Sequence, residues 1–375
     1  MTQSTPARRV AVVGGGVLGT SVAAHLAARG AGVTLVTEAG PASGASGRSL
    51  SWLNSSGPHP EEYHRLRSVG LERYRALAAR PGTTARIAFD GGLMWATPGE
   101  GQCAQLEWMR ATGYPAELLS RDQVRERIPG VDPSAVPDEG AISNPAEGWV
   151  DLPSLVDQLA RDLVAAGGAV RTGAGRCRTI VQDGRVTGVR TGSGDVLTAD
   201  AVLLATGAAV PGALAELGVA VPDASTNAVL VRTAPFDHRL RAVLNTPRVS
   251  LRPAPGGGLV IDAGWSEEEV VARDDGTFEV HDWTVAGLLA EASRVLEGNP
   301  PLTVASCGAG RKPIPADGHP VLGAVDAVPG LYVAFTHSGA TLGLVAGELL
   351  AADILTGSVD PLLVPFRLDR FSRRS

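Results

Sequence analysis

The stretch Arg9-Val-Ala-Val-Val-Gly-Gly-Gly-Val-Leu-Gly19 decides the fold. Its apolar, β-branched beginning is typical of a buried parallel strand, and the glycine pattern GxGxxG follows at once. A helical pattern then runs to about Arg29, and Val33–Thr37 predicts a second strand with Glu38 at its end. Strand, glycine turn, helix, strand and acid in this order predict a Rossmann-type unit that binds a dinucleotide.

Each glycine of the pattern has its own physical task. Gly14 allows the tight turn, Gly16 lets the backbone approach a pyrophosphate, and Gly19 permits close packing of helix on strand. The helix N-terminus offers N–H groups and a positive dipole to the phosphates. Glu38, 19 residues after Gly19, is placed to accept hydrogen bonds from ribose hydroxyls and to repel the 2′-phosphate of NADP. This unit predicts cofactor contacts at Gly14, Gly16, Val17, Leu18, Gly19 and Glu38.

The next segment distinguishes between two dinucleotides. Pro41-Ala-Ser-Gly-Ala-Ser-Gly-Arg-Ser-Leu-Ser-Trp-Leu-Asn54 is small, polar and rich in glycine. An NAD-binding domain would normally continue into a helix here, whereas this composition predicts a loop whose backbone comes close to a flat, polar group. The segment therefore favours FAD over NAD.

Together with the glycine unit, Gly44–Asn54 resembles the D-amino acid, glycine and sarcosine oxidase family, the DAO-type FAD-dependent oxidoreductases. The likeness spans about residues 8 to 358 and is densest in the segments that hold FAD. Besides the N-terminal unit, it rests on Asn144–Pro153, on Ala201–Gly207, and on Gly310–Gly323 followed by Leu331–Leu342.

The resemblance implies an α/β fold, α+β overall, in which a Rossmann-like FAD-binding domain is interleaved with an antiparallel-sheet substrate domain. We expect the FAD domain to comprise residues 1–56, 150–213 and 305–358. The substrate domain would comprise residues 57–149 and 214–304, and residues 359–375 would form a C-terminal tail. We expect this tail to be frayed from Phe366 to Ser375, where it is rich in arginine.

The same resemblance extends the expected FAD contacts and implies that FAD is bound without a covalent bond. Some relatives attach flavin through a cysteine where this chain has Gly310, or through a histidine in a loop that contains none here, residues 44–51. A helix that begins just after His337 would point its N-terminus at the pyrimidine end of the flavin and stabilise the reduced anion. The further expected contacts are Ser46, Gly47, Arg48, Ser49, Leu50, Cys177, Ala205, Thr206, Gly207, Gly310, Ser338, Gly339, Ala340, Thr341 and Leu342.

The substrate end is less well defined by the sequence. In Val249-Ser-Leu-Arg252, strand alternation places Arg252 opposite Val249 and Leu251, where a guanidinium could grip a carboxylate; the alternative is a surface arginine. Lys312, the only lysine, could contact flavin, substrate or dioxygen, or could lie on the rim. Trp52 either walls the flavin or fills the core, and His337 either lines the flavin or satisfies the turn.

These features favour an enzyme that oxidises the C–N bond of an amino acid or secondary amine by hydride transfer to flavin N5, giving an imine that hydrolyses. Dioxygen or another acceptor would take the electrons. Two alternatives stay open: a flavin oxidoreductase acting on a 2-hydroxy acid or a secondary-metabolite tailoring substrate, and a catalytically silent FAD-binding subunit. The sequence does not favour sarcosine as the substrate, because Val260 and Gly343 stand where sarcosine-oxidase-like relatives carry lysines.

Composition adds three expectations. The net charge of −6 argues against a nucleic-acid partner, which would need a basic surface. The three cysteines are far apart and form no CxxC pair, so a disulfide framework and a thiolate metal site are not indicated and a cytoplasmic location fits best. We expect no window that approaches the roughly 20 uncharged apolar residues of a membrane span.

Overall fold

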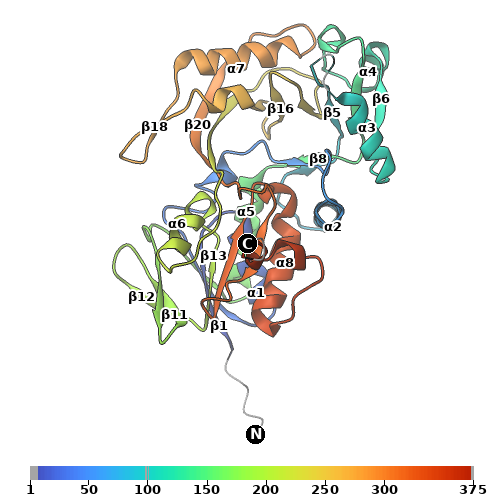
Figure 1. Ribbon diagram of the computed structural model, residues 1–375. Helices are drawn as coiled ribbons and strands as arrows, with labels where there is room; N and C mark the ends of the chain where they lie inside the picture. The colour runs from blue at the N-terminus through green and yellow to red at the C-terminus, as the bar shows by residue number, and fades with distance from the viewer. Residues whose placement is uncertain (1–6, 98, 100, 373–375) are drawn as a thin grey trace.

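The computed structural model describes residues 7–97, 99 and 101–372. Two lobes lie one above the other in Figure 1, one built on a six-stranded sheet and the other on an eight-stranded sheet. The N- and C-terminal segments both belong to the lower lobe, and the chain passes between the two lobes several times. The mixed α/β architecture expected from the sequence is confirmed.

The lower lobe begins with the predicted unit. Strand β1 occupies Arg9–Val13 as expected, and helix α1 and strand β2 follow at Val17–Ala28 and Gly32–Val36. The sheet order is β21-β22-β13-β1-β2-β9, and all neighbours are parallel except the antiparallel pair β21–β22. The remaining strands are β9 (Ala169–Arg171), β13 (Ala201–Leu204), β21 (Val321–Ala324) and β22 (Leu331–Phe335).

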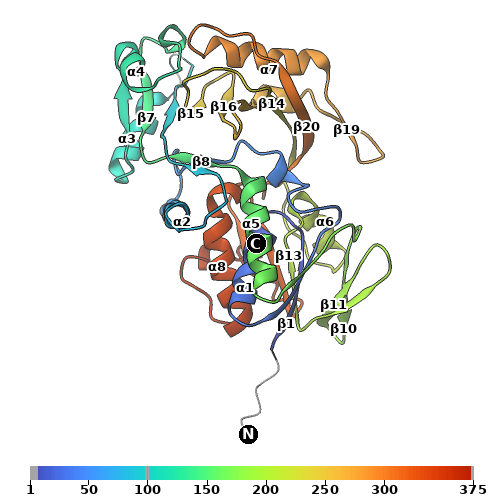
Figure 2. The ribbon, with the colours of Figure 1, turned by 180° about the vertical axis from the view of Figure 1, so that it is seen from behind.

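Different elements cover the two faces of this sheet. Helices α1, α5 (Leu152–Ala165) and α8 (Gly339–Thr356) share one apolar core, and Figure 2 shows them side by side. The other face packs on a three-stranded meander, β10 (Arg178–Gln182), β11 (Arg185–Arg190) and β12 (Val196–Thr198), and on the short helix α6 (Val210–Ala215). Asp183 and Gly184 have positive φ between β10 and β11, which allows the tight turn of this hairpin.

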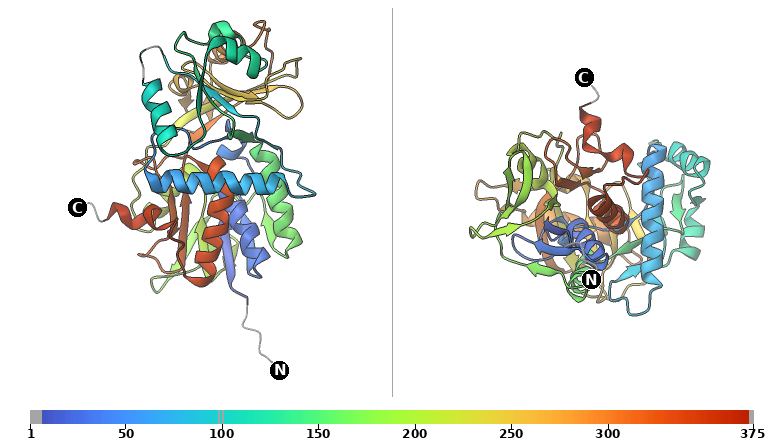
Figure 3. Two further views of the ribbon diagram at one scale, coloured as in Figure 1. Left: turned by 90° about the vertical axis from the view of Figure 1, so that its right-hand side faces the viewer. Right: turned by 90° about the horizontal axis from the view of Figure 1, so that it is seen from below.

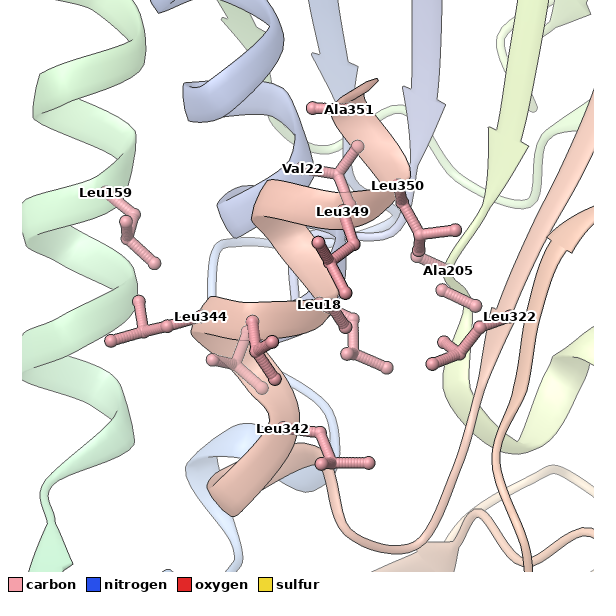
Figure 4. Packing of buried hydrophobic residues seen from close by; sticks show 14 of the residues in the cluster. Leu18, Val22, Leu159, Ala205, Leu322, Leu342, Leu344, Leu349, Leu350 and Ala351 are labelled. Atoms are coloured by element: carbon pink, nitrogen blue, oxygen red, sulfur yellow. The ribbon is translucent and has the colours of Figure 1, made fainter. Parts of the chain in front are cut away.

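Helix α8 packs unusually closely on α1 because glycines line the contact. A Cβ at Gly347 would lie 2.0 Å from Ser21 Oγ, and one at Gly343 would lie 2.6 Å from Val17 Cγ2. Leucines of α8 pack against Leu18 and Val22 in Figure 4. Among the described residues, α8 is the one helix long and apolar enough to cross a membrane, but it carries Glu348 and Asp353, and 61% of it is buried in the protein.

The upper lobe is organised around the order β20-β14-β17-β16-β15-β5-β7-β6, in which only the pair β15–β5 is parallel. Helices α4 (Arg121–Arg127) and α7 (Asp282–Arg294) pack on its outer face, and α3 (Gln102–Ala111) lies at one end. A small hairpin joins β18 (Val271–Ala272) to β19 (Phe278–Glu279). The sheet strands are β5 (Gly92–Met94), β6 (Glu117–Leu119), β7 (Ala141–Asn144), β14 (Thr226–Thr233), β15 (Val243–Asn245), β16 (Ser250–Pro253), β17 (Leu259–Asp262) and β20 (Val304–Lys312).

The division between the lobes differs from the expected boundaries in two places. Strand β20 pairs with β14 in the upper sheet, although residues 305–312 were assigned to the FAD domain. Helix α2 (Glu61–Ala78), assigned to the substrate domain, shares the apolar core of α8 and crosses it in Figure 3. A Cβ at Gly70 of α2 would lie 2.4 Å from Thr341 O, which explains the close crossing. A small sheet of β3 (Trp52–Leu53), β4 (Ile87–Ala88) and β8 (Gly148–Val150) adjoins both lobes.

The C-terminal segment is docked as far as Arg370, so the expectation of fraying from Phe366 onward is wrong for this part. Arg367 Nη1 lies 2.8 Å from Asp353 Oδ2, and Arg370 Nε lies 2.8 Å from Asp317 Oδ2. Both arginine side chains are largely buried by these contacts.

Candidate active site

The glycine loop brings the ends of β1 and β13 together. Gly14 has a φ of +117°, and a Cβ there would lie 2.2 Å from Ala205 O. A Cβ at Gly19 would lie 2.0 Å from Gly14 O, so both positions require glycine on steric grounds. At the start of α1, Val17 N donates to Ser46 Oγ at 3.0 Å, which joins the loop of residues 45–47 to the helix N-terminus. Gly16, the N-cap, offers no capping side chain to the first turn.

Two buried polar atoms around this loop have no hydrogen-bond partner among the described residues. They are Arg48 Nε and Thr206 Oγ1. The Arg48 side chain lies over bare backbone of β20, because a Cβ at Gly310 would be 2.9 Å from Arg48 Nε and one at Gly308 would be 3.1 Å from Arg48 Cδ. Buried donors without partners are costly, so this region is organised for a polar ligand.

Glu38 and Cys177 lie together beyond the end of β2. Glu38 O accepts a hydrogen bond from Gly175 N at 3.2 Å, and the Glu38 side chain is exposed. Burial, with a smaller contribution from the Glu38 charge, raises the pKa of the Cys177 thiol. The carboxylate is thus free for ribose hydroxyls, and the neighbouring thiol stays protonated.

The start of α8 is fixed by a residue that sequence reasoning missed, Arg67 of α2. Arg67 Nη1 donates to Ser338 Oγ at 2.6 Å, and Nη2 donates to Asn54 O and Asn54 Oδ1, both at 2.8 Å. Tyr63 OH lies 2.6 Å from Ser338 Oγ, and Thr341 Oγ1 donates to Trp52 O at 3.3 Å. These contacts hold the α8 N-terminus against residues 52–54. The Leu342 side chain points into the apolar core, so only its backbone faces this junction.

A buried carboxyl group, also missed from the sequence, lies behind Trp52. Tyr114 OH donates to Glu147 Oε1 at 2.8 Å and accepts from Ser55 N at 2.8 Å. A Cβ at Gly92 would lie 2.3 Å from Glu147 Oε2 and 3.3 Å from Trp52 Nε1, so Gly92 leaves room for both groups. Glu147 is 1% exposed, and burial raises its pKa to about 8 despite the opposing effects of Tyr114, Trp52 and Arg67.

Arg252 faces the lower lobe, on the opposite side of β16 from the core residue Leu251, as the alternation predicts. Its side chain is fully buried; Nε donates to Leu50 O at 2.5 Å and Nη1 to Pro253 O at 2.8 Å. Nη2 lies 3.8 Å from Asp151 Oδ1 and has no hydrogen-bond partner among the described residues. Burial lowers the pKa of Arg252 to about 10, which still leaves it charged at neutral pH.

Lys312 and His337 lie within electrostatic range of each other. Lys312 Nζ forms an ion pair with Glu267 Oε1, and Glu267 Oε2 accepts a hydrogen bond from Thr226 Oγ1 at 3.1 Å. His337 is exposed, yet desolvation by the surrounding protein, aided by the charges of Lys312 and Arg67, lowers its pKa to about 4. The imidazole is therefore neutral at physiological pH.

Residues 9–353 match the family model described as FAD dependent oxidoreductase, DAO. The chain is a member of this family. It is 28% identical to glycine oxidase from Geobacillus kaustophilus over 96% of both chains. The crystal structure of glycine oxidase from that organism superposes on this chain with a TM-score of 0.79 and 23% identity, and the superposition covers 97% of this chain and 99% of the other. It is 31% identical to anaerobic glycerol-3-phosphate dehydrogenase subunit A1 from Haloferax volcanii over 53% of this chain. The chain spans only 28–36% of the length of that protein and of two other long curated relatives.

For this FAD-dependent oxidoreductase, the residues present fit the cofactor. The Gly14–Gly19 turn and the uncapped first turn of α1 suit a pyrophosphate, and Glu38 suits a ribose. Arg48 Nε and Thr206 Oγ1, which have no hydrogen-bond partner among the described residues, could bind polar atoms of the cofactor. Gly47 belongs to the same loop, where a Cβ would lie 2.3 Å from Ala42 O. The other predicted contacts of this loop, of the β13 end and of the α8 start lie along the same junction, namely Ser49, Leu50, Gly207, Gly339 and Ala340.

The structure brings the four predicted substrate-end residues of this flavoenzyme to the junction of its lobes, but in different settings. Arg252 and Trp52 are linked through the segment of Leu50. Lys312 is already paired with Glu267, and His337 precedes α8 without a hydrogen bond from its ring among the described residues. Arg67 had a detectable signal: Tyr63, Arg67, Gly70 and Tyr74 form one helical stripe, and a charged residue within such a stripe indicates a buried polar contact.

Proposed function

We propose that this flavoenzyme binds FAD noncovalently and oxidises the C–N bond of an amino acid or secondary amine. When bound, FAD supplies a hydride acceptor at N5, and the resulting imine hydrolyses in water. The similarity to glycine oxidase over nearly the whole chain supports an amine substrate. The protein's task is then to orient the substrate and to hold its charges.

The observation that carries this proposal is the unpaired Nη2 donor of Arg252. A buried guanidinium with an open donor is unfavourable unless a ligand completes its hydrogen bonds. A substrate carboxylate would do so by accepting a charge-assisted hydrogen bond from Nη2. Because Nε is already bonded to Leu50 O, the carboxylate would be held directly against the loop that also carries Arg48 and Trp52.

Other residues of the junction would assist without acid–base chemistry. Neutral His337 adds no positive charge beside a substrate amine, which must be uncharged to release hydride. The α8 N-terminus, held by Arg67 and Thr341, would stabilise negative charge on the reduced cofactor. Trp52, backed by Glu147, would form a rigid wall.

Two further features are part of the proposal. Arg48 occupies the space over Gly310 where some relatives carry an attachment cysteine, which supports noncovalent FAD. Cys103, Cys177 and Cys307 are free thiols, which supports a reducing compartment such as the cytoplasm. Dioxygen or another acceptor would reoxidise the cofactor.

The deciding experiment is anaerobic reduction of the bound flavin by a panel of glycine, D- and L-amino acids, N-methyl amino acids, cyclic amines and matching 2-hydroxy acids. We expect bleaching by a small set of amines that carry a carboxylate. Bleaching by hydroxy acids alone would refute the proposal. Mixing the reduced enzyme with dioxygen then separates oxidase from dehydrogenase behaviour, since only an oxidase recovers its yellow colour rapidly.

A further inference from the structure

Three adjacent strands of the upper sheet place a row of polar side chains on one face. The strand register pairs Asn245 of β15 with Ser250 of β16, and Ser250 with Asp262 of β17. Directly paired residues project from the same side of a sheet, so the three side chains form one continuous row. All three are partly exposed, and Ser250 Oγ donates to Asn245 Oδ1 at 2.9 Å. Their neighbours alternate into the outer core, namely Leu244, Leu251 and Ile261.

This polar row looks toward the FAD loop. Arg252 projects from the same face as Ser250, two residues away, and donates to Leu50 O. The paired strands β14 and β20 continue the face to Gly308 and Gly310, on which Arg48 lies. Asp262, at the end of the row, is therefore on the substrate side of the junction, beside the proposed carboxylate clamp.

In the part of the chain that the structure describes, the Asp262 carboxylate forms no ion pair at contact distance, although the charges of Lys312 and Arg252 act on it from further away. Glu267 and Asp262 both lie near Lys312, but Lys312 forms its ion pair with Glu267. The carboxylate nearest to Arg252 Nη2 belongs to Asp151. Among the described residues, the Asp262 carboxylate has no hydrogen-bond donor, and burial raises its pKa to about 6 although Lys312 opposes the shift. It is therefore mostly ionised at neutral pH and incompletely stabilised.

We propose that Asn245, Ser250 and Asp262 form a subsite for a positively charged nitrogen of the substrate. The substrate class is then an amino acid whose side chain ends in an ammonium or guanidinium group. The inference rests on the proposed function, because it assumes that the carboxylate of the same molecule is held by Arg252. A cation at this subsite would form an ion pair with Asp262 and donate a hydrogen bond to Ser250 Oγ.

The first test uses holoenzyme and substrate pairs that differ in charge but hardly in shape: arginine against citrulline and lysine against norleucine, each in both stereochemistries. The limiting rate and apparent Kd of anaerobic flavin reduction are measured for each. We expect the cationic member to be preferred by roughly tenfold or more, as for one charge-assisted hydrogen bond. Asp262→Asn should abolish most of this preference, whereas Asp274→Asn, an identical change at an exposed loop position, should leave it intact.

A second test does not depend on turnover. 5-Guanidinopentanoate is arginine without its α-amine, so it can bind but cannot be oxidised there, and 5-ureidopentanoate is its neutral counterpart. Perturbation of the flavin absorption spectrum should give a Kd at least roughly tenfold lower for the guanidino compound in the wild type, and about equal values in Asp262→Asn. If it binds in this way but no amine reduces the flavin, the proposed function fails and the subsite stands. Equal binding in the wild type, or an unchanged preference in Asp262→Asn, overturns the subsite.

Discussion

Replacement of Glu147 by Gln tests whether the carboxyl group behind Trp52 is protonated at neutral pH. Glu147 is buried between Tyr114, Trp52 and the bare backbone of Gly92. Its pKa in the folded protein is about 8, whereas an ordinary glutamate has 4.5. Gln keeps the oxygen that accepts from Tyr114 and cannot ionise, so it imitates the protonated form.

The expected magnitude follows from linkage. Between the two pKa values the folded protein retains a proton that the unfolded chain has released, so the free energy of unfolding falls as pH rises, by about 1.4 kcal/mol per unit. The contribution of this group is complete below pH 4.5 and is lost as pH rises to about 8. From about pH 5 to pH 7.5 the loss amounts to about 3 kcal/mol. Glu147→Gln should remove this loss, so the stability of the variant relative to the wild type should rise by that amount over the same interval.

The assay is chemical denaturation of wild type and variant at a series of pH values with saturating FAD. The quantity of interest is the difference in unfolding free energy between the two proteins, which cancels the titration of all other groups. Glu139→Gln is the matched control, because Glu139 is exposed and its replacement should leave the pH profile unchanged. A constant difference between Glu147→Gln and wild type across the interval would show that Glu147 ionises normally, and would refute the claim that burial keeps it protonated.

Three further predictions concern the cofactor and the carboxylate clamp. Gly19→Ala should raise the Kd of FAD on titration of the apoprotein, because the new Cβ would lie 2.0 Å from Gly14 O and displace the loop. Overpacking of this kind destabilises the folded protein by roughly 1–3 kcal/mol. Gly212→Ala is the control and should leave the Kd of FAD unchanged, because no heavy atom lies within 4 Å of a Cβ at that position. Arg252→Leu should raise KM for a carboxylate substrate roughly tenfold or more while sparing an amine that lacks the carboxylate; an equal effect on both would exclude the clamp. Acid precipitation should release FAD into the supernatant, and a yellow pellet would contradict noncovalent binding.

The fold of the glycine unit was predictable because its determinants are local. The steric need for glycine at positions 14 and 19 arises from the strand, turn and helix that surround them, so the sequence pattern carries the geometry. The bounds of β1 agree with prediction, and those of α1 and β2 agree within one residue at their ends. The boundary errors have another cause: β20 and α2 choose their lobe through partners far along the chain, such as β14 and α8.

The buried polar network escaped prediction for the same reason. Arg67 meets Ser338 across 271 residues, and Tyr114 meets Glu147 across 33. A lone Glu or Arg in a sequence is far more often exposed than buried, and only the tertiary contact distinguishes the two cases. Gly92 illustrates why the sequence did not predict this network. Nothing in its local sequence indicates that the absence of a side chain makes room for the carboxylate of Glu147 and the indole of Trp52.

To predict which side chains of the upper sheet face the substrate, one must know the register between neighbouring strands, which the alternation of residues within one strand does not give. The pattern Val249-Ser-Leu-Arg252 correctly placed Arg252 away from the core, and the hairpin turn at residues 255–258 joins its strand to β17. What remained open was the register across that hairpin. The structure pairs Pro253 with Leu259, which places Asp262 opposite Ser250; a slip of one residue would turn Asp262 into the outer core. A carboxylate at this position is tolerable only in the observed register, so the turn that fixes the register also determines which charges the substrate meets.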